Sequence, residues 1–370
     1  MQVRQFTVSR DDYVYESFPD VARAGGDRLV CVFSRCTHHG DRAFTRNVYV
    51  TSDDRGRTWS EPRPLTDPLY QERGDDPFWD CPRVSRLADG RLVAAVNRIA
   101  GDTPDREEER TWLLESEDGG ETWGDPRATP ARGIVPDQVV ELDAGRWLLT
   151  VHTVTEVSGE ERWRVQTWLS DDEGATWEGP HVVAEEPDYM LCEGSVVELP
   201  GGDLACLMRE NSGRGLDAFV AVSEDGGETW GEPFRVPIPA CHRPVAGVLQ
   251  SGRVLVTHRH MQGGAGWLGS WTQNTFAALT DADSLTAGAR EEASARIVPL
   301  DYDRSAAADT GYTGWVQFDD GEVYVVNYVV DDAPARPVRE PSGYGGDYDE
   351  VPKAYVRGYA FHERDLVVDP

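Results

Sequence analysis

The chain has 370 residues, with 36 basic and 66 acidic side chains, which give a net charge of −30 at pH 7. This charge argues against nucleic acid or an anionic membrane surface as a partner. Hydrophobic residues make up 39% of the sequence and include 12 Trp, 13 Tyr and 10 Phe, so we expect a large apolar core. Lys353 is the sole lysine, a bias that fits either a salt-rich cytoplasm or a GC-rich genome.

The sequence also bears on the compartment. No apolar run approaches the roughly 20 residues that a membrane-spanning helix needs, and the first residues lack the basic-then-apolar pattern of a signal peptide. We therefore expect a cytoplasmic protein, whose oligomeric state the sequence leaves open. The six cysteines have no Cys-x-x-Cys spacing and are too sparse for a disulfide scaffold, so we expect reduced thiols.

Strand patterns extend along the whole chain. After a first strand at residues 2–9, an apolar strand, a turn centred on glycine and a second apolar strand recur six times, and no segment has a helical period. A last strand is expected at residues 354–361, where it would pair with the first strand. Residues 331–352, rich in Pro, Gly and acidic residues, are expected to form a long surface loop. The six turn glycines are Gly26, Gly90, Gly145, Gly202, Gly252 and Gly321.

A second repeat, Ser-x-Asp-x-Gly-x-Thr-Trp, has four copies, which begin at Ser52, Ser116, Ser170 and Ser223. Each copy begins 21 to 26 residues after the preceding turn glycine, and an eroded fifth copy falls at residues 280–285. The Asp can accept hydrogen bonds from the turn backbone, the Gly can adopt positive φ, and the Trp can cover apolar surface. We interpret this box as a structural turn, because one active site does not need four copies.

The two repeats have the same phase, so the repeating unit is hairpin, strand, box and strand, with a mean spacing of 59 residues. Six such units predict an all-β fold, a six-bladed β-propeller of four-stranded antiparallel blades. We expect residues 1–370 to form this propeller as a single domain.

In these boxes the sequence resembles the sialidase (neuraminidase) superfamily of six-bladed propellers. The family pocket lies on the propeller axis, at the starts and ends of the inner strands. The resemblance therefore directs attention to the polar residues that flank the glycine hairpins. These are Asp20, Arg35, His38, His39, Asp41, Arg83, Arg98, Asp137, His152, Glu193, Arg209, Arg243, Arg259, His260, Tyr312 and Tyr328.

The resemblance implies particular roles in hydrolysis of a terminal glycoside. Tyr312 matches the nucleophilic tyrosine, Glu193 the carboxylate that takes its proton, and Asp41 the acid/base aspartate. Arg209, with Arg259 or Arg243, matches the arginines that hold a substrate carboxylate. A phenol suits a sialic acid, because an anionic nucleophile would be repelled by the carboxylate on the anomeric carbon. The expected function is a retaining exo-glycosidase acting on a small, acidic, sialic-acid-like glycan, without a cofactor.

The sequence departs from the family at Ser17-Phe18-Pro19, where an Arg-Ile-Pro motif is usual. Arg35, Arg83 or Arg98 could supply the missing charge from a neighbouring strand. Two alternatives therefore stay open: a sialidase-fold glycosidase that acts on a different sugar, and a non-catalytic carbohydrate-binding propeller.

A metal site has weak support in the sequence. His258 and His260 share one face of a strand and, with His38 and His39, are the candidate ligands. Without a Cys or carboxylate at ligand spacing, we expect no metal.

Overall fold

The computed structural model describes residues 3–71, 73–74, 76–100, 107–262, 272–337 and 351–366. Its strands form six antiparallel sheets, so the predicted six-bladed β-propeller with four-stranded blades is confirmed. Two sheets include a short fifth strand. Contacts divide the chain into two compact units, unit 1 (Met1–Ala128 with Tyr302–Pro370) and unit 2 (Thr129–Asp301).

Unit 1 contains three blades. Blade 1 consists of β2 (Tyr15–Gly25), β3 (Arg28–His38), β4 (Asp41–Ser52) and β5 (Arg63–Pro64), with β6 (Leu69–Tyr70) also paired to β4. Blade 2 consists of β7 (Phe78–Trp79), β8 (Arg83–Arg86), β9 (Leu92–Ile99), β10 (Arg110–Ser116) and β11 (Arg127–Ala128). Blade 6 consists of β24 (Thr313–Gln317), β25 (Glu322–Val329), β26 (Tyr355–His362) and β1 (Arg4–Ser9).

Unit 2 contains the other three blades. Blade 3 consists of β12 (Val140–Glu141), β13 (Trp147–Val157), β14 (Glu160–Ser170) and β15 (Glu178–Ala184). Blade 4 consists of β16 (Leu191–Glu198), β17 (Leu204–Glu210), β18 (Phe219–Ser223) and β19 (Phe234–Arg235). Blade 5 consists of β20 (Cys241–Val248), β21 (Val254–Gln262), β22 (Thr272–Thr280) and β23 (Arg296–Tyr302).

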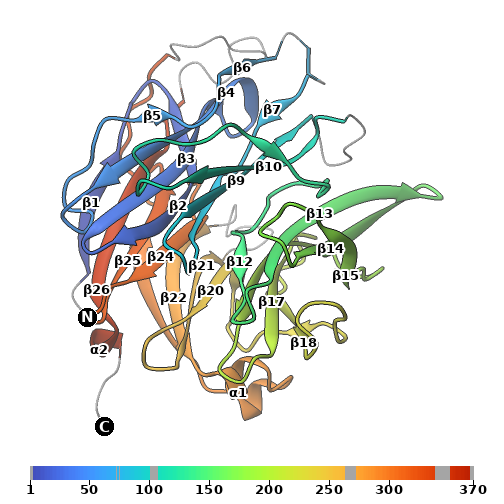
Figure 1. Cartoon of the computed structure of the whole chain (residues 1–370). Helices are drawn as coiled ribbons and strands as arrows, with labels where there is room; N and C mark the ends of the chain where they lie inside the picture. Colours follow the sequence, from blue (N-terminus) through green and yellow to red (C-terminus); the bar gives the residue numbers. More distant parts are fainter. Residues whose placement is uncertain are drawn as a thin grey trace. The chain divides into compact units, whose positions relative to one another are not determined.

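The N-terminal strand completes the last blade. β1 pairs antiparallel with β26, with Arg4 opposite Ala360, and the two strands lie side by side in blue and red in Figure 1. This pairing is the one that the sequence predicted, with β26 one residue later than expected. The first residue of the predicted N-terminal strand, Gln2, and residues 338–350 of the predicted surface loop lie outside the described residues.

The six predicted turn glycines all occupy the hairpin between the first and second strands of a blade. Their φ angles lie between 52° and 97°, a region that glycine enters without a steric penalty. In blade 1 the register pairs Leu29 with Ser52, so the glycine hairpin and the box lie at the same end of the blade. We call this end of each blade the box end.

The boxes are turns held by their own side chains. In the first box Asp54 Oδ1 accepts hydrogen bonds from Ser52 Oγ at 2.8 Å and from the Thr58 backbone N–H at 2.8 Å. Ser52 Oγ in turn accepts the N–H of Gly56 at 2.8 Å, and Trp59 Nε1 donates to the Gly56 carbonyl at 3.1 Å. The structural interpretation of the box therefore agrees with its geometry.

The box glycine also permits a close approach of the preceding blade. A Cβ on Gly56 would lie 2.2 Å from the ring of Tyr324, and a Cβ on Gly120 would lie 2.5 Å from Val30 Cγ2. The eroded box in blade 5 has no such turn. A short helix α1 (Ala282–Leu285) stands in its place, capped by Asp281, which accepts the N–H of Ser284.

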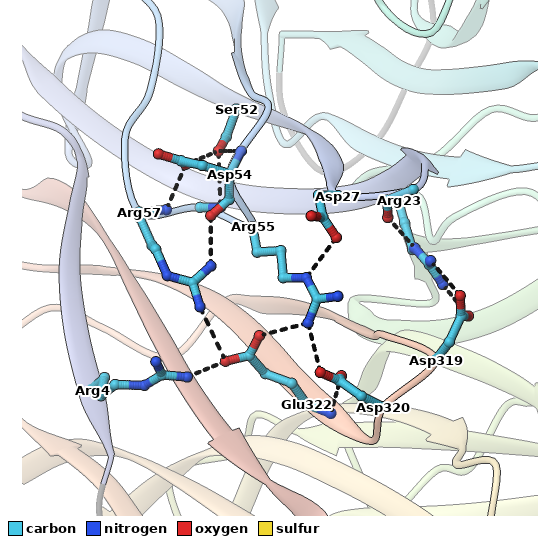
Figure 2. Close-up of polar contacts among 12 residues, drawn as sticks. Arg4, Arg23, Asp27, Ser52, Asp54, Arg55, Arg57, Asp319, Asp320 and Glu322 are labelled. Atoms are coloured by element: carbon cyan, nitrogen blue, oxygen red, sulfur yellow. Dashed lines mark hydrogen bonds and ion pairs between the residues drawn. The ribbon is translucent and has the colours of Figure 1, made fainter.

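Ion pairs link blades 6 and 1 at their box ends, as Figure 2 shows. Arg55 in the first box pairs with Asp27 at 2.6 Å, Asp320 at 2.7 Å and Glu322 at 3.5 Å. Glu322, at the start of β25, also pairs with Arg4 of β1. The closing strand and the first box are thus tied to the same carboxylate.

The same contact occurs elsewhere with the charges exchanged. Arg28, at the start of β3, contacts Glu121 in the box of blade 2. Arg146, directly before β13, pairs with Glu228 in the box of blade 4 at 3.0 Å. At these two junctions the hairpin supplies the arginine and the box the carboxylate. Between blades 6 and 1 the box supplies the arginine.

Two sequence expectations outside the sheets also have outcomes. The six cysteines all lie in described segments, are buried and form no disulfide. The described α-helices, α1 and α2 (Glu363–Leu366), have four residues each, so neither could span a membrane.

Candidate active site

Each blade end opposite the box is called here the bulge end, because several first strands contain a β-bulge there. Phe18, Glu193 and Arg243 occupy these bulges with φ of 56°, 49° and 53°. Non-glycine residues rarely adopt this left-handed conformation, which costs free energy and is common at functional sites. A bulge also redirects a side chain away from the regular strand alternation.

Two aspartates near these bulges join adjacent blades. Asp20 Oδ2 accepts the backbone N–H of Val84 at 2.8 Å, and Asp137 Oδ2 accepts that of Val196 at 2.9 Å. Both carboxylates are buried. The sequence placed these aspartates near the axis, and their observed contacts are structural.

Glu193 lies in a cluster of arginines in unit 2. Arg209 Nη1 donates to Glu193 Oε1 at 2.9 Å, and Arg243 Nε lies 3.4 Å from Oε2. Glu193 and Arg243 are buried, with exposed fractions of 5% and 1%. The structure thus brings together Glu193 and two of the arginines that the sequence named for the site.

His242 links this pair to the third arginine of unit 2. Arg209 Nε donates to His242 Nε2 at 2.9 Å, and Arg259 Nη1 lies 3.3 Å from Nδ1. Burial, followed by the charges of Arg209 and Arg259, lowers the pKa of His242 far below its ordinary value. The imidazole is therefore neutral, and the cluster contains three guanidiniums, those of Arg209 and Arg243 at Glu193 and that of Arg259 at His242. The sequence analysis missed His242, although it directly precedes Arg243.

A second histidine supports Glu193 from blade 3. The backbone N–H of Glu193 donates to His152 Nδ1 at 3.3 Å. Burial lowers the pKa of His152 to about 4, so the ring is neutral and can accept this hydrogen bond.

A pocket of about 320 Å³ opens beside the arginine cluster. Arg209 and His242 contribute charged and polar atoms to its wall, and Leu216 and Met261 contribute apolar surface. Its other lining residues are Glu210, Asn211, Gly213, Gly215, Asp217 and Ala240. A concave site with a few convergent polar groups is typical of small-ligand binding.

Tyr312 lies in unit 1, in a cluster of aromatic rings, and is 5% exposed. Its ring packs edge-on against Phe18, with centroids 4.8 Å apart, and lies 6.1 Å from the ring of Tyr328. Phe18 also contacts the ring of His39 at 5.1 Å. The departure from the family motif at Ser17-Phe18-Pro19 therefore places an aromatic ring against the predicted nucleophile.

Asp41 begins β4, on the hairpin that follows His38. Its carboxylate is fully buried, and Oδ1 accepts the backbone N–H of Ala43 at 2.9 Å. This bond to the residue two positions later is an ordinary turn device.

Asp309 belongs to the same cluster as Tyr312 and was not predicted. It accepts hydrogen bonds from the hydroxyls of Tyr15 and Tyr328 and contacts His39 Nδ1. Its place three residues before Tyr312 was the available signal.

Arg35, a candidate for the missing arginine, has two carboxylate partners. It pairs with Asp11 at 2.8 Å and with the buried Glu16 at 3.3 Å. Burial is the largest influence on Glu16 and raises its pKa to about 7, although Arg35 opposes the shift.

Arg83 and Arg98 also have partners within unit 1. Arg83 is buried, lies 3.4 Å from Asp20 and donates to the Thr313 carbonyl at 3.0 Å, next to Tyr312. The guanidinium of Arg98 stands 6.0 Å from the Trp79 ring.

Arg42 also adjoins the aromatic cluster, and the sequence analysis missed it. Its guanidinium lies 5.2 Å from the ring centroid of Phe18 and 3.3 Å from Asp80. The signal was its position directly after Asp41.

The histidines named as metal candidates do not form a ligand set. Among the described residues, no group of three or more His, Cys, Asp or Glu side chains could hold a metal ion. His260 instead stacks on Phe276 at 4.2 Å, and the ring of His258 lies 6.2 Å from that of His260.

The chain resembles known proteins in sequence and in structure. The family model described as BNR repeat-like domain matches residues 75–264, just over half of the chain. A protein of unknown function from Dyadobacter fermentans has 23% identity and a TM-score of 0.74, covering 97% of this chain and 99% of its own. The intramolecular trans-sialidase from Ruminococcus gnavus has 14% identity and a TM-score of 0.64, covering 96% of both chains. A Hadza microbial sialidase has 17% identity and a TM-score of 0.65, covering 95% of this chain and 66% of its own. With its boxes and six blades, the chain belongs to the BNR repeat-like domain family.

Proposed function

We propose that this protein is a retaining exo-glycosidase that removes a terminal acidic sugar, with Tyr312 as the nucleophile. The observation that carries the proposal is the arginine cluster of unit 2. Arg209, Arg243 and Arg259 gather around Glu193 and the neutral His242, beside a pocket of about 320 Å³. In a chain with a net charge of −30, such a gathering of cations favours an anionic ligand.

The arginines would hold the carboxylate of the sugar. A guanidinium presents two parallel N–H groups that match the two oxygens of a carboxylate, and this fixes the position of the substrate. Arg209 lines the pocket and is therefore the first candidate for this contact. The neutral His242 keeps its nitrogens beside Arg209 and Arg259 without adding a competing charge.

The proposed chemistry has two steps. In the first, the Tyr312 oxygen attacks the anomeric carbon, the Glu193 carboxylate takes the phenol proton, and the bond to the leaving oxygen breaks as an acid protonates it. In the second, water attacks the same carbon, the conjugate base of that acid takes a water proton, and Glu193 returns the proton to Tyr312. The sequence nominates Asp41 as the acid.

The second candidate function keeps the fold and the nucleophile but changes the sugar. Ser17 is fully buried, and Phe18 occupies the bulge of blade 1. The nearby Arg42 is paired with Asp80. With a buried aromatic ring at this place and Arg42 paired, blade 1 favours a sugar whose binding needs no carboxylate contact here.

The test is a screen of terminal aryl glycosides that includes sialosides, uronides and neutral sugars. On the best substrate we expect Tyr312→Phe to lower kcat by orders of magnitude with little change in binding, because it removes one hydroxyl. Tyr70→Phe removes the hydroxyl of a 51% exposed tyrosine in β6 and should leave the rate unchanged.

The screen separates the alternatives. Preference for sialosides supports the acidic sugar, and preference for a neutral glycoside supports the second candidate. An active Tyr312→Phe variant would disprove the nucleophile. A parent protein that hydrolyses nothing but binds a glycan would be a carbohydrate-binding propeller.

A further inference from the structure

A histidine–carboxylate pair adjoins the predicted nucleophile in unit 1. His39 lies between β3 and β4, and its Nδ1 is 2.5 Å from Asp309 Oδ2. An ionised carboxylate can only accept hydrogen bonds, so Nδ1 carries the proton. The other nitrogen, Nε2, forms no hydrogen bond within the described part of the chain and is the atom that would exchange protons with a ligand.

Asp309 is held in place by two further donors. Tyr15 Oη donates to Oδ2 at 2.6 Å and Tyr328 Oη donates to Oδ1 at 2.7 Å. Burial, reinforced by the charge of Asp309, raises the pKa of Tyr15 well above its ordinary value, so this hydroxyl stays a donor. The carboxylate is therefore fixed before any ligand arrives, and it fixes the His39 ring.

His39 is accessible where Asp41 is not. The His39 side chain is 41% exposed, whereas Asp41 is fully buried and bonds the turn backbone at Ala43. The His39 ring also packs against Phe18, which packs against Tyr312, so the imidazole belongs to the same aromatic cluster as the proposed nucleophile.

We infer that His39, oriented by Asp309, is the acid/base group of the reaction and that Asp41 is a structural turn residue. This inference rests on the proposed glycosidase function. A histidine suits the role because its ordinary pKa lies near neutrality, so both protonation states are accessible.

The proton transfers balance. In the first step imidazolium Nε2–H protonates the leaving oxygen as the glycosidic bond breaks, while the Tyr312 oxygen bonds to the anomeric carbon and its proton passes to Glu193. In the second step neutral Nε2 takes a proton from the attacking water, the bond to Tyr312 breaks, and Glu193 returns its proton to the phenolate. His39 ends as the imidazolium from which it began.

Several titratable or charged groups surround His39, and they bear on the pH dependence. Asp309 contacts the His39 ring directly, and Tyr15 and Tyr328 donate hydrogen bonds to Asp309. Arg42 reaches the same Phe18 ring, and His38 is adjacent in sequence. Burial, then His39 and Lys353, lower the pKa of His38 to about 4, so His38 is uncharged at neutral pH.

The test compares two substrates of the same sugar, one with a nitrophenol leaving group and one with an alkyl alcohol. Loss of a general acid slows hydrolysis of the alkyl glycoside most, because an alkoxide is a poor leaving group, whereas nitrophenolate departs without a proton. We expect His39→Gln to lower kcat/KM for the alkyl glycoside about 100-fold or more and for the nitrophenyl glycoside much less. The alkaline limb of the pH–rate profile should disappear as well.

Two variants serve as controls. His181→Gln makes the same chemical change at a half-buried histidine in β15 that contacts the Glu228 carbonyl, and it should resemble the parent. Asp41→Asn should lower kcat/KM for both glycosides by the same factor, because it reduces the fraction of folded protein. It should keep the alkaline limb of the pH–rate profile. A melting curve for each variant measures the folding contribution.

Each failure has its own signature. If Asp41→Asn shows the leaving-group split and His39→Gln does not, the assignment to His39 is wrong while the proposed function stands. If the parent hydrolyses neither glycoside, nor any other in the screen, the proposed function fails and the role of His39 fails with it.

Discussion

The two ends of the blades use charged residues in different ways. At the box end the paired carboxylates are commonly exposed, as in Glu228, which is 55% exposed and contacts Arg146, although the paired Glu322 is buried. At the bulge end the charges are buried: Glu193 is 7% exposed at its side chain and lies between two guanidiniums. Exposed pairs add little stability, whereas buried charges depend on every partner.

The backbone conformation also differs between the box end and the bulge end. At the box end, positive φ falls on glycines such as Gly26 and Gly90, which adopt it readily. At the bulge end it falls on Phe18, Glu193 and Arg243, where it costs free energy. The comparison shows which end satisfies local folding rules and which end departs from them, as functional sites often do.

The largest expected effect separates the two ends directly. Glu193→Gln should lower the free energy of unfolding by about 3 kcal/mol, because buried guanidiniums lose their carboxylate. Glu228→Gln at the box end should lower it by less than about 1 kcal/mol, because its pair with Arg146 is exposed. Urea unfolding of both variants measures the difference, and equal losses would remove the distinction between the ends.

Glu16, buried at the bulge end of β2, should make stability depend on pH. Its pKa is raised from 4.5 to about 7, so the folded state holds the proton more tightly and stability falls as pH rises through that window. One such proton corresponds to a slope of up to about 1.4 kcal/mol per pH unit. Unfolding measured at pH 5 and pH 7.5 should show this decline in the parent and a smaller one in Glu16→Gln. An unchanged slope in the variant would assign the decline to other groups.

A single box should be worth less than the Glu193 cluster. Asp54→Ala removes the acceptor for Ser52 and for the backbone and hydroxyl of Thr58, and a lost turn cap of this kind costs about 1 kcal/mol. The glycoside activity of the parent should be retained, because the box is at the opposite end of the blade. Loss of activity without loss of stability would contradict the structural role of the box.

The smallest effect is expected for the ion pairs of Figure 2. Arg55→Gln removes contacts to the exposed Asp27 and Asp320 and to the buried Glu322, which keeps its pair with Arg4. The loss should therefore be below about 1 kcal/mol and should shrink as KCl screens the pairs. The parent itself should melt at a higher temperature in molar KCl, because the net charge of −30 repels itself at low salt. A melting temperature that does not change with KCl would leave genome composition as the explanation for the single lysine among the basic residues.

The fold could be predicted because its signals are local and repeated. A turn glycine requires only its neighbouring residues, and so does a box held by hydrogen bonds within itself. Because the two repeats have the same phase, their number of copies gives the number of blades. The prediction failed at the eroded fifth box, where Asp281 caps a short helix instead. The charge exchange between Arg55 with Glu322 and Arg28 with Glu121 was visible only once the adjacent blades were known.

The site was harder to predict, because its contacts join residues distant in sequence. The sequence alone determined the blade repeat and the box chemistry, and it placed Glu193 and Arg209 on the two strands of one hairpin. The ion pair between them came from the structure. Only the tertiary structure decided that Asp41 is buried and that Asp309, 270 residues from His39, orients its ring. Burial and hydrogen-bond geometry set what a polar side chain can do, and both depend on neighbours that the chain supplies only when it folds.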